Sequence, residues 1–188
     1  MEHVKEKLAR FTTDQLKAMD EKGYNALLKA CSLPSMSPHV MQYLVTTKKV
    51  DINCQLPRDF DRSTAKGLIP EMSALSVAIN SGNVKLVSIF MKRRKEISIP
   101  SSDAEGNTAL HHCVLSGSKE SFRKIFPLFK PLKWKKMRNS EGKNPLEIVR
   151  ELKQLREGKK KEKEKFTYME MTMRRKDSKR SMGKKKIV

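Results

Sequence analysis

The residues best suited to chemistry in this sequence are the consecutive His111, His112 and Cys113. Imidazole nitrogens and thiolates are zinc ligands, and a cysteine beside a histidine can also act as a nucleophile with its base. Successive side chains on a helix point in different directions, however, so three neighbours cannot close a tetrahedral site. No further His–Cys or carboxylate cluster stands at ligand spacing. We therefore predict no metal site here.

Other signatures of catalysis or cofactor binding are missing from the sequence as well. It has no glycine-rich phosphate loop, no nucleophile elbow and no kinase signature set. Asp59 and Asp61 lie in a segment interrupted by Pro57 and Pro70, where solvated loop charges are the ordinary explanation. We predict that the chain is not an enzyme and binds no cofactor.

The His-His-Cys tripeptide belongs to a pattern that recurs four times along the chain. A helix-capping residue is followed two positions later by leucine, and three of the four copies have glycine two positions earlier. The capping residues are Asn25, Ser73, Thr108 and Asn144, at spacings of 48, 35 and 36 residues. The leucines, which should fill the space between neighbouring helix pairs, are Leu27, Leu75, Leu110 and Leu146.

This frame resembles the ankyrin repeat, whose signature places Asp and Gly before Thr-Pro-Leu-His-x-Ala. In the clearest copy Ala109 replaces the Pro and Cys113 replaces the Ala. The resemblance implies an all-α solenoid of stacked helix-turn-helix units with β-hairpin or loop connections. It also implies that His111 ties one turn to the next by hydrogen bonds. The family period is about 33 residues, so the first spacing requires an insertion at about Gln55–Glu71.

The predicted organisation has three parts. Capping helices occupy residues 1–19, and repeats follow at about 20–53, 70–99, 103–136 and 139–155. The last repeat ends in a helix from Pro145 to about Leu155, with leucines at 146, 152 and 155 turned inward. Residues 156–188 form a basic tail that we expect to be disordered.

Proteins of the family mostly bind other proteins, through the concave surface lined by hairpin tips and by the exposed ends of the first helices. The insertion and a basic loop could contribute as well. The predicted partner-binding residues are Lys22, Tyr24, Met72, Glu105, Asn107, Glu141 and Lys143 at the tips; Asn80, Ser81, Leu115 and Ser116 at the helix ends; Arg58 and Arg62 in the insertion; and Lys133, Trp134, Lys135 and Lys136 in the loop.

Two basic segments allow more than one interpretation. Trp134 among basic residues suits a binding hot spot or a stacking contact, but it can equally pack inside the fold while its neighbours stay in water. The run Lys92–Lys95 follows a predicted helix, where cations stabilise the helix dipole, so local stabilisation explains it adequately.

The net charge is +20 over 188 residues, and residues 150–188 alone carry 16 basic and 6 acidic side chains. Such an excess favours nucleic acid, an anionic membrane face or an acidic protein as partner, or simply solubility. Within the tail, the alternating apolar pattern of residues 166–173 could add as a strand to a partner or dock back on the repeats. The predicted localisation residues are Arg174, Arg175, Lys176, Lys179, Arg180, Lys184, Lys185 and Lys186, with Ser178 as a candidate phosphosite.

The three scattered cysteines, the lack of an apolar leader and the lack of a long apolar run predict a cytoplasmic or nuclear protein with no membrane span. Two functions remain open. The first is a protein-interaction adaptor or scaffold that binds through the repeats. The alternative is a nuclear, nucleic-acid-associated protein that uses the tail and the Lys133–Arg138 loop.

Overall fold

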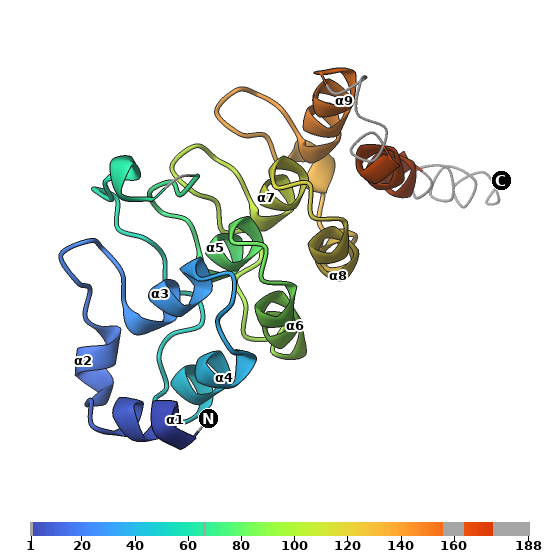
Figure 1. Cartoon of the computed structure of the whole chain (residues 1–188). Coiled ribbons are helices and arrows are strands. Elements are labelled where there is room, and N and C mark those ends of the chain that lie inside the picture. Colours follow the sequence, from blue (N-terminus) through green and yellow to red (C-terminus); the bar gives the residue numbers. More distant parts are fainter. Residues whose placement is uncertain (1, 66, 156–163, 175–188) are drawn as a thin grey trace, which may run out of the picture.

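The computed structural model describes residues 2–65, 67–155 and 164–174, and it is all-helical over these residues. Four helices form an inner row: α3 (Ala26–Ser32), α5 (Ala74–Asn80), α7 (Ala109–Leu115) and α9 (Pro145–Leu155). An outer row contains α4 (Pro38–Thr46), α6 (Val84–Lys92) and α8 (Lys119–Phe129). Each inner helix packs on the next, and so do the outer helices (Figure 1). The result is the stacked solenoid expected from the repeats.

Two short helices precede the stack. Helix α1 (Glu2–Ala9) packs on α4, and α2 (Thr13–Lys17) packs on α3. Helix α2 begins with a capping box in which the Thr12 hydroxyl accepts the Gln15 N–H and the Gln15 side chain accepts the Thr12 N–H. Only Leu16 of α2 is buried, and it covers the open face of the first repeat.

The inner helices begin where the capping residues predict. The side chains of Asn25, Ser73 and Asn144 accept backbone N–H groups of the first helical turn that follows each of them. A leucine stands two positions after each of these three caps and after Thr108. All four leucines are buried, and each is at most 7% exposed. The helix-cap and leucine predictions are therefore confirmed.

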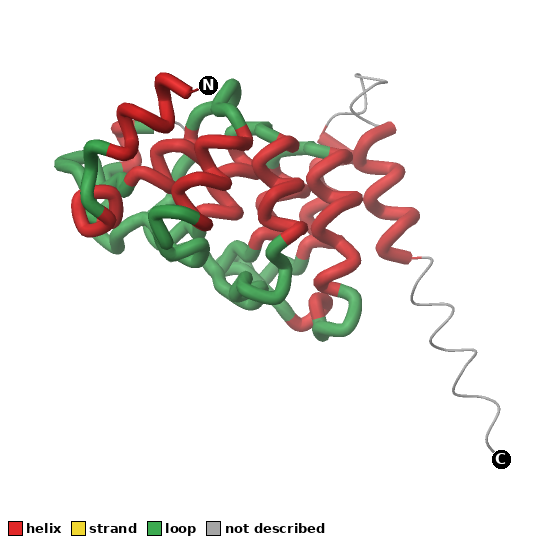
Figure 2. Tube along the Cα trace, turned by 90° about the horizontal axis from the view of Figure 1, so that it is seen from below, coloured by secondary structure: helices red, strands yellow, loops and turns green. Residues whose placement is uncertain are grey.

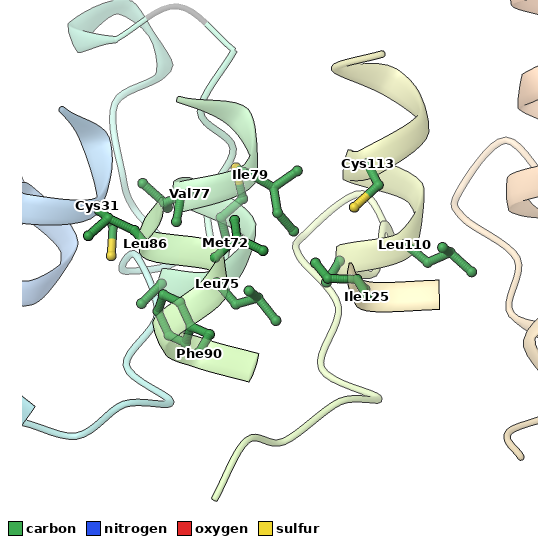
Figure 3. Close-up of a cluster of buried hydrophobic side chains, with 14 of the residues drawn as sticks. Cys31, Met72, Leu75, Val77, Ile79, Leu86, Phe90, Leu110, Cys113 and Ile125 are labelled. Atoms are coloured by element: carbon green, nitrogen blue, oxygen red, sulfur yellow. The ribbon is translucent and has the colours of Figure 1, made fainter. Parts of the chain in front are cut away.

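The core runs continuously between the two rows of helices (Figure 3). Its largest fully buried side chains include Phe90 of α6, and Phe122, Phe126 and Phe129 of α8. Phe122 and Phe126 stack with ring centroids 5.0 Å apart. Small side chains, Ala30, Ala78 and Cys113, are buried where the inner helices meet, because close helix packing leaves room for little else.

The fourth repeat is longer than the sequence predicts. Residues 164–174 form a helix beside α8 that completes the outer row, seen clearly in Figures 1 and 2. Phe166, Met169 and Met173 are fully buried, and the Tyr168 ring meets the edge of Phe122 at 6.5 Å. The expected disorder of the tail is wrong for this segment. The buried residues recur at i, i+3 and i+7, the spacing of one helix face, so the strand interpretation is wrong as well.

An ionic cluster fastens this terminal helix to α9. Glu170, only 7% exposed, accepts Lys153 at 3.0 Å and Arg174 at 2.6 Å, with Arg150 at 3.7 Å. Burial alone would raise the pKa of the Glu170 carboxyl, but the Lys153 hydrogen bond and the surrounding cations hold that pKa below its ordinary value. At the end of α9, Leu155 is 76% exposed and does not turn inward as expected.

Candidate functional site

Connecting loops project from the inner row as four tips, which we define as residues 20–24, 55–72, 103–107 and 139–143. Three tips share one turn. The side-chain oxygen of Asp20, Asp103 or Asn139 accepts the backbone N–H four residues later at 2.8–2.9 Å, and a glycine at positive φ closes each turn. The second tip has Glu71 (φ 64°) at the glycine position. Among the described residues, two isolated β-bridges close the bases of the second and third tips, Gln55 with Ser73 and Ser102 with Thr108, and no extended strand occurs.

Neighbouring tips are hydrogen-bonded to one another. The Ala104 N–H donates to the Pro70 carbonyl at 3.0 Å, and the Ser140 N–H donates to the Glu105 carbonyl at 2.8 Å. An ion pair of 2.6 Å joins Arg62 to Glu105. These contacts hold the second, third and fourth tips as one continuous edge of the molecule.

The histidine pair is structural. The Nδ1 atom of His111 accepts the Thr108 N–H at 3.1 Å, so the Nε2 proton points to the Lys143 carbonyl at 3.2 Å, in the next repeat. This confirms the predicted link between turns. Burial lowers the pKa of His111 to about 4, which keeps the ring neutral at pH 7.

His112 turns the other way and meets the buried Asp103 carboxylate at 2.8 Å. Burial alone would raise the Asp103 pKa, but the hydrogen bond and charge of His112, with two backbone N–H donors, hold it below its ordinary value. Asp103 thus joins its own tip to α7, and the two histidines serve different partners. No cluster of three metal-ligating side chains occurs in the part of the chain that the structure describes.

The insertion folds back as the second tip instead of extending freely. Phe60 is buried against Tyr24 of the first tip, with ring centroids 5.5 Å apart and perpendicular planes. Its short 3₁₀-helix η1 (Arg62–Thr64) is capped by Asp61, whose carboxylate accepts the Ser63 N–H. Hydrogen bonds between Leu56 and both Met72 and Glu71 close its base.

Four predicted contact residues are buried and have no surface to offer a partner: Tyr24, Met72, Asn107 and Trp134, each at most 7% exposed. Tyr24 packs on the insertion, and Met72 enters the core (Figure 3). The Asn107 side chain accepts from Asn139 of the next tip at 3.1 Å. Trp134, in the 3₁₀-helix η2 (Trp134–Lys136), packs edge-on against Phe126 at 5.9 Å, so the packing interpretation of Trp134 is the correct one.

The remaining predicted contacts reach the surface to different degrees. Ser116 and the side chains of Lys22, Arg58, Lys133, Lys135, Lys136 and Glu141 are exposed. The half-buried ones are Asn80, Ser81, Glu105 and Lys143, and the Lys143 ammonium is held by Glu151 at 2.6 Å and Glu141 at 3.0 Å. Arg62 is exposed although it is ion-paired, and Leu115 is 43% exposed at the end of α7.

Sequence reasoning missed Leu33, which is 39% exposed just after α3. Pro34 obscures the repeat frame there. Of the predicted localisation residues only Arg174 lies within the described residues, where it pairs with Glu170. The others, and the candidate phosphosite Ser178, lie outside them. No helix in the described ranges has the length and apolar character needed to cross a membrane.

All three cysteines are free and poorly exposed. Burial raises the pKa of the Cys31 and Cys113 thiols, and it raises the pKa of Cys54 to about 11. Thiols with such pKa values remain protonated and are weak nucleophiles at neutral pH. They therefore serve as small apolar core residues.

The contact between the third and fourth tips can be tested at Gly106 (φ 75°). A Cβ atom there would lie 3.1 Å from the Asn139 backbone, whereas one at Gly142 (φ 72°) would meet nothing within 4 Å. Both substitutions by alanine strain a left-handed residue, at about 1 kcal/mol. We expect Gly106→Ala to cost about 1 kcal/mol more than Gly142→Ala in urea unfolding. Equal losses would show that the two tips do not touch.

Comparison with known families agrees with this arrangement. Residues 38–130 match the family model of ankyrin repeats, in three copies. The matched range begins at α4 and ends after α8, so the first tip and the whole fourth unit lie outside it. No curated protein matches the chain.

Proposed function

This chain is an ankyrin-repeat protein, and from that premise we propose that it is an adaptor that binds a partner protein along its tips and the carboxyl ends of its inner helices. Ankyrin repeats are in general protein-interaction modules, typically without catalytic activity of their own. Fold alone names no partner, so the proposal rests on what this surface presents.

One observation carries the proposal: large apolar side chains are exposed where inner helices end. The described residues contain six exposed large apolar side chains, and three of them, Leu33, Leu115 and Leu155, follow or end α3, α7 and α9. Leu115 is the most central of the three along the stack. An exposed leucine in such a place suits the buried centre of an interface, where few residues supply most of the binding energy.

The tips, which precede the same inner helices, supply a polar rim to this surface. Arg58 is 89% exposed and Glu141 66% exposed, as side chains, although each takes part in an ion pair. Exposed pairs of this kind contribute at most about 1 kcal/mol to folding. A partner can therefore exchange them for its own charges at small cost. The exposed Lys133, Lys135 and Lys136 extend the rim with positive charge.

The decisive variant is Leu115→Asp, with Met171→Asp as its matched control. Met171 is 46% exposed on the terminal helix, so the two changes are equal in chemistry and nearly equal in exposure. We expect Leu115→Asp to weaken partner binding at least about tenfold, because it places a charge in a desolvated contact. Met171→Asp should leave binding unchanged, and thermal melting should show both variants folded.

Binding is measured by capture from nuclease-treated cell lysate, with the bound proteins quantified by mass spectrometry. The proposal stands if one protein is retained by the wild type and by Met171→Asp and is depleted by Leu115→Asp. Equal retention by all three chains would refute the proposed surface. Loss of bound material on nuclease treatment alone would favour the nucleic-acid alternative instead.

A further inference from the structure

The outer helices carry a basic surface that is separate from the tips and the inner helix ends. Two adjoining hollows cross it, one between α4 and α6 with a volume of about 520 Å³ and one beside α6 and α8 of about 580 Å³. Ser88 and Lys92 of α6 line both. We infer that this surface, which we name the outer groove, binds an acidic amphipathic peptide segment of a partner protein.

The rim of the outer groove is positively charged. Lys85 and Lys92 border the first hollow, and Lys92, Arg94, Lys95 and Lys124 border the second. All five of these cations are exposed, and none forms an ion pair with another described residue. Three cations of the tips, Arg58, Arg62 and Lys143, are by contrast ion-paired.

Acidic side chains near the outer groove do not cancel this charge. The Nε and Nη2 atoms of Arg93 donate to the two carboxylate oxygens of Glu96, at 3.0 and 2.6 Å. Glu120 lines only a third hollow, which adjoins the first through Lys85 and Ser88. The outer groove therefore has five unpaired cations and one unpaired acid. An anionic ligand would relieve the repulsion between these cations.

Helix-dipole stabilisation does not account for the pattern. Cations at the end of α6, from Lys92 to Lys95, do favour the dipole. Lys85, however, is the second residue of α6, and Lys124 lies in the middle of α8. A cation in a first helical turn is unfavourable to the dipole, so the placement of Lys85 calls for another reason.

The floor of the outer groove favours a peptide over a nucleic acid. Ile89 and Pro38 line the first hollow and Met91 the second, all three half-buried, so apolar side chains can dock there. His39 supplies one ring to the first hollow, but neither hollow is lined by a phenylalanine, tyrosine or tryptophan, although successive aromatic rings are the usual means of holding single-stranded bases. Lysine stems can cover the apolar side chains of a ligand while their ammonium groups meet its carboxylates. An amphipathic segment with acidic flanks matches both the apolar floor and the basic rim of the outer groove.

The test uses the full chain and a fluorescein-labelled synthetic peptide of about fourteen residues, with leucine at every third or fourth position among Asp and Glu residues. Binding is followed by fluorescence anisotropy at about 0.05 and 0.2 M salt. We expect Lys85→Glu/Lys92→Glu to weaken binding at least about tenfold. The matched control is Lys17→Glu/Lys130→Glu, which makes the same charge change at exposed lysines outside the hollows and the tips and should change affinity less than about twofold.

Several outcomes would overturn the inference. One is equal weakening by the two double variants, which indicates diffuse attraction to net charge. Another is equal affinity for a peptide of the same composition with its leucines grouped at one end, and a third is no binding at all. Tighter binding of a DNA duplex with the same dependence on Lys85 and Lys92 would assign the groove to nucleic acid. Self-association of the chain that the Lys85→Glu/Lys92→Glu change abolishes would assign it to a second copy. None of these variants touches Leu115, so the result is independent of the adaptor test.

Discussion

Replacing Phe122 by alanine is expected to lower the free energy of unfolding by about 3–5 kcal/mol, the usual range for a fully buried phenylalanine. Phe122 is 0% exposed and lies where α8 meets the terminal helix. Its ring stacks on Phe126 at 5.0 Å and meets the edge of Tyr168 at 6.5 Å. Truncation removes contacts to both neighbours and leaves a cavity at the junction of the third and fourth repeats.

Urea unfolding, followed by far-UV circular dichroism, measures this loss directly. Lys124→Ala is the control, because Lys124 is exposed two residues further along α8 and should change stability by no more than about 0.5 kcal/mol. A loss below about 1 kcal/mol for Phe122→Ala would mean that the terminal helix does not pack on α8 as described.

Acidification from neutral pH toward pH 4 should destabilise the protein through His111. His111 takes up a proton near pH 6.5 in the unfolded chain but only near pH 4 in the folded one. The unfolded state therefore binds this proton at a higher pH than the folded state does. The stability contributed by neutral His111 is complete above about pH 6.5 and is lost as the pH falls toward 4. The expected total is about 3 kcal/mol.

A series of urea titrations between pH 7 and pH 4 tests this expectation. His111→Gln should be less stable than the wild type at pH 7, because it disturbs the bonds to Thr108 and Lys143, but its stability should depend less on pH across this window. The same slope for His111→Gln and wild type would show that His111 is not responsible. The lowered pKa of Asp103 adds a further loss only at lower pH.

The repeats were predictable because each has a local cause. A capping residue, a glycine turn and a leucine two positions after the cap recur in fixed order, and each side chain acts mainly within its own turn or on the next repeat. His111 could be assigned from the same frame. Prediction failed where the pattern was brief or ambiguous. Residues 166–173 fit a two-residue period about as well as a helical one, and only the presence of α8 beside them favours the helix.

The candidate surface was harder to predict than the fold. Position in a tip does not reveal whether a side chain points outward, so Tyr24 and Met72 were assigned to the surface although tertiary contacts bury them. The outer groove left only a partial signal, because Lys85 and Lys92 share one face of α6 but Lys124 joins them only when α8 packs beside α6. Spatial gathering of this kind depends on packing between repeats, and a single sequence does not encode it as a motif.

The reactivity of the three thiols reports partial opening of the native protein. Cys31 lies in the first repeat, Cys54 at the base of the second tip and Cys113 in the third repeat, so the three sample successive positions along the stack. A thiol-specific reagent at neutral pH can modify the buried Cys31 and Cys113 only after the segments around them have opened, whereas the half-buried Cys54 needs a smaller local opening. If the solenoid unravels from one end, Cys31 and Cys113 will be modified one after the other, and if it opens in a single step these two will react at one common rate.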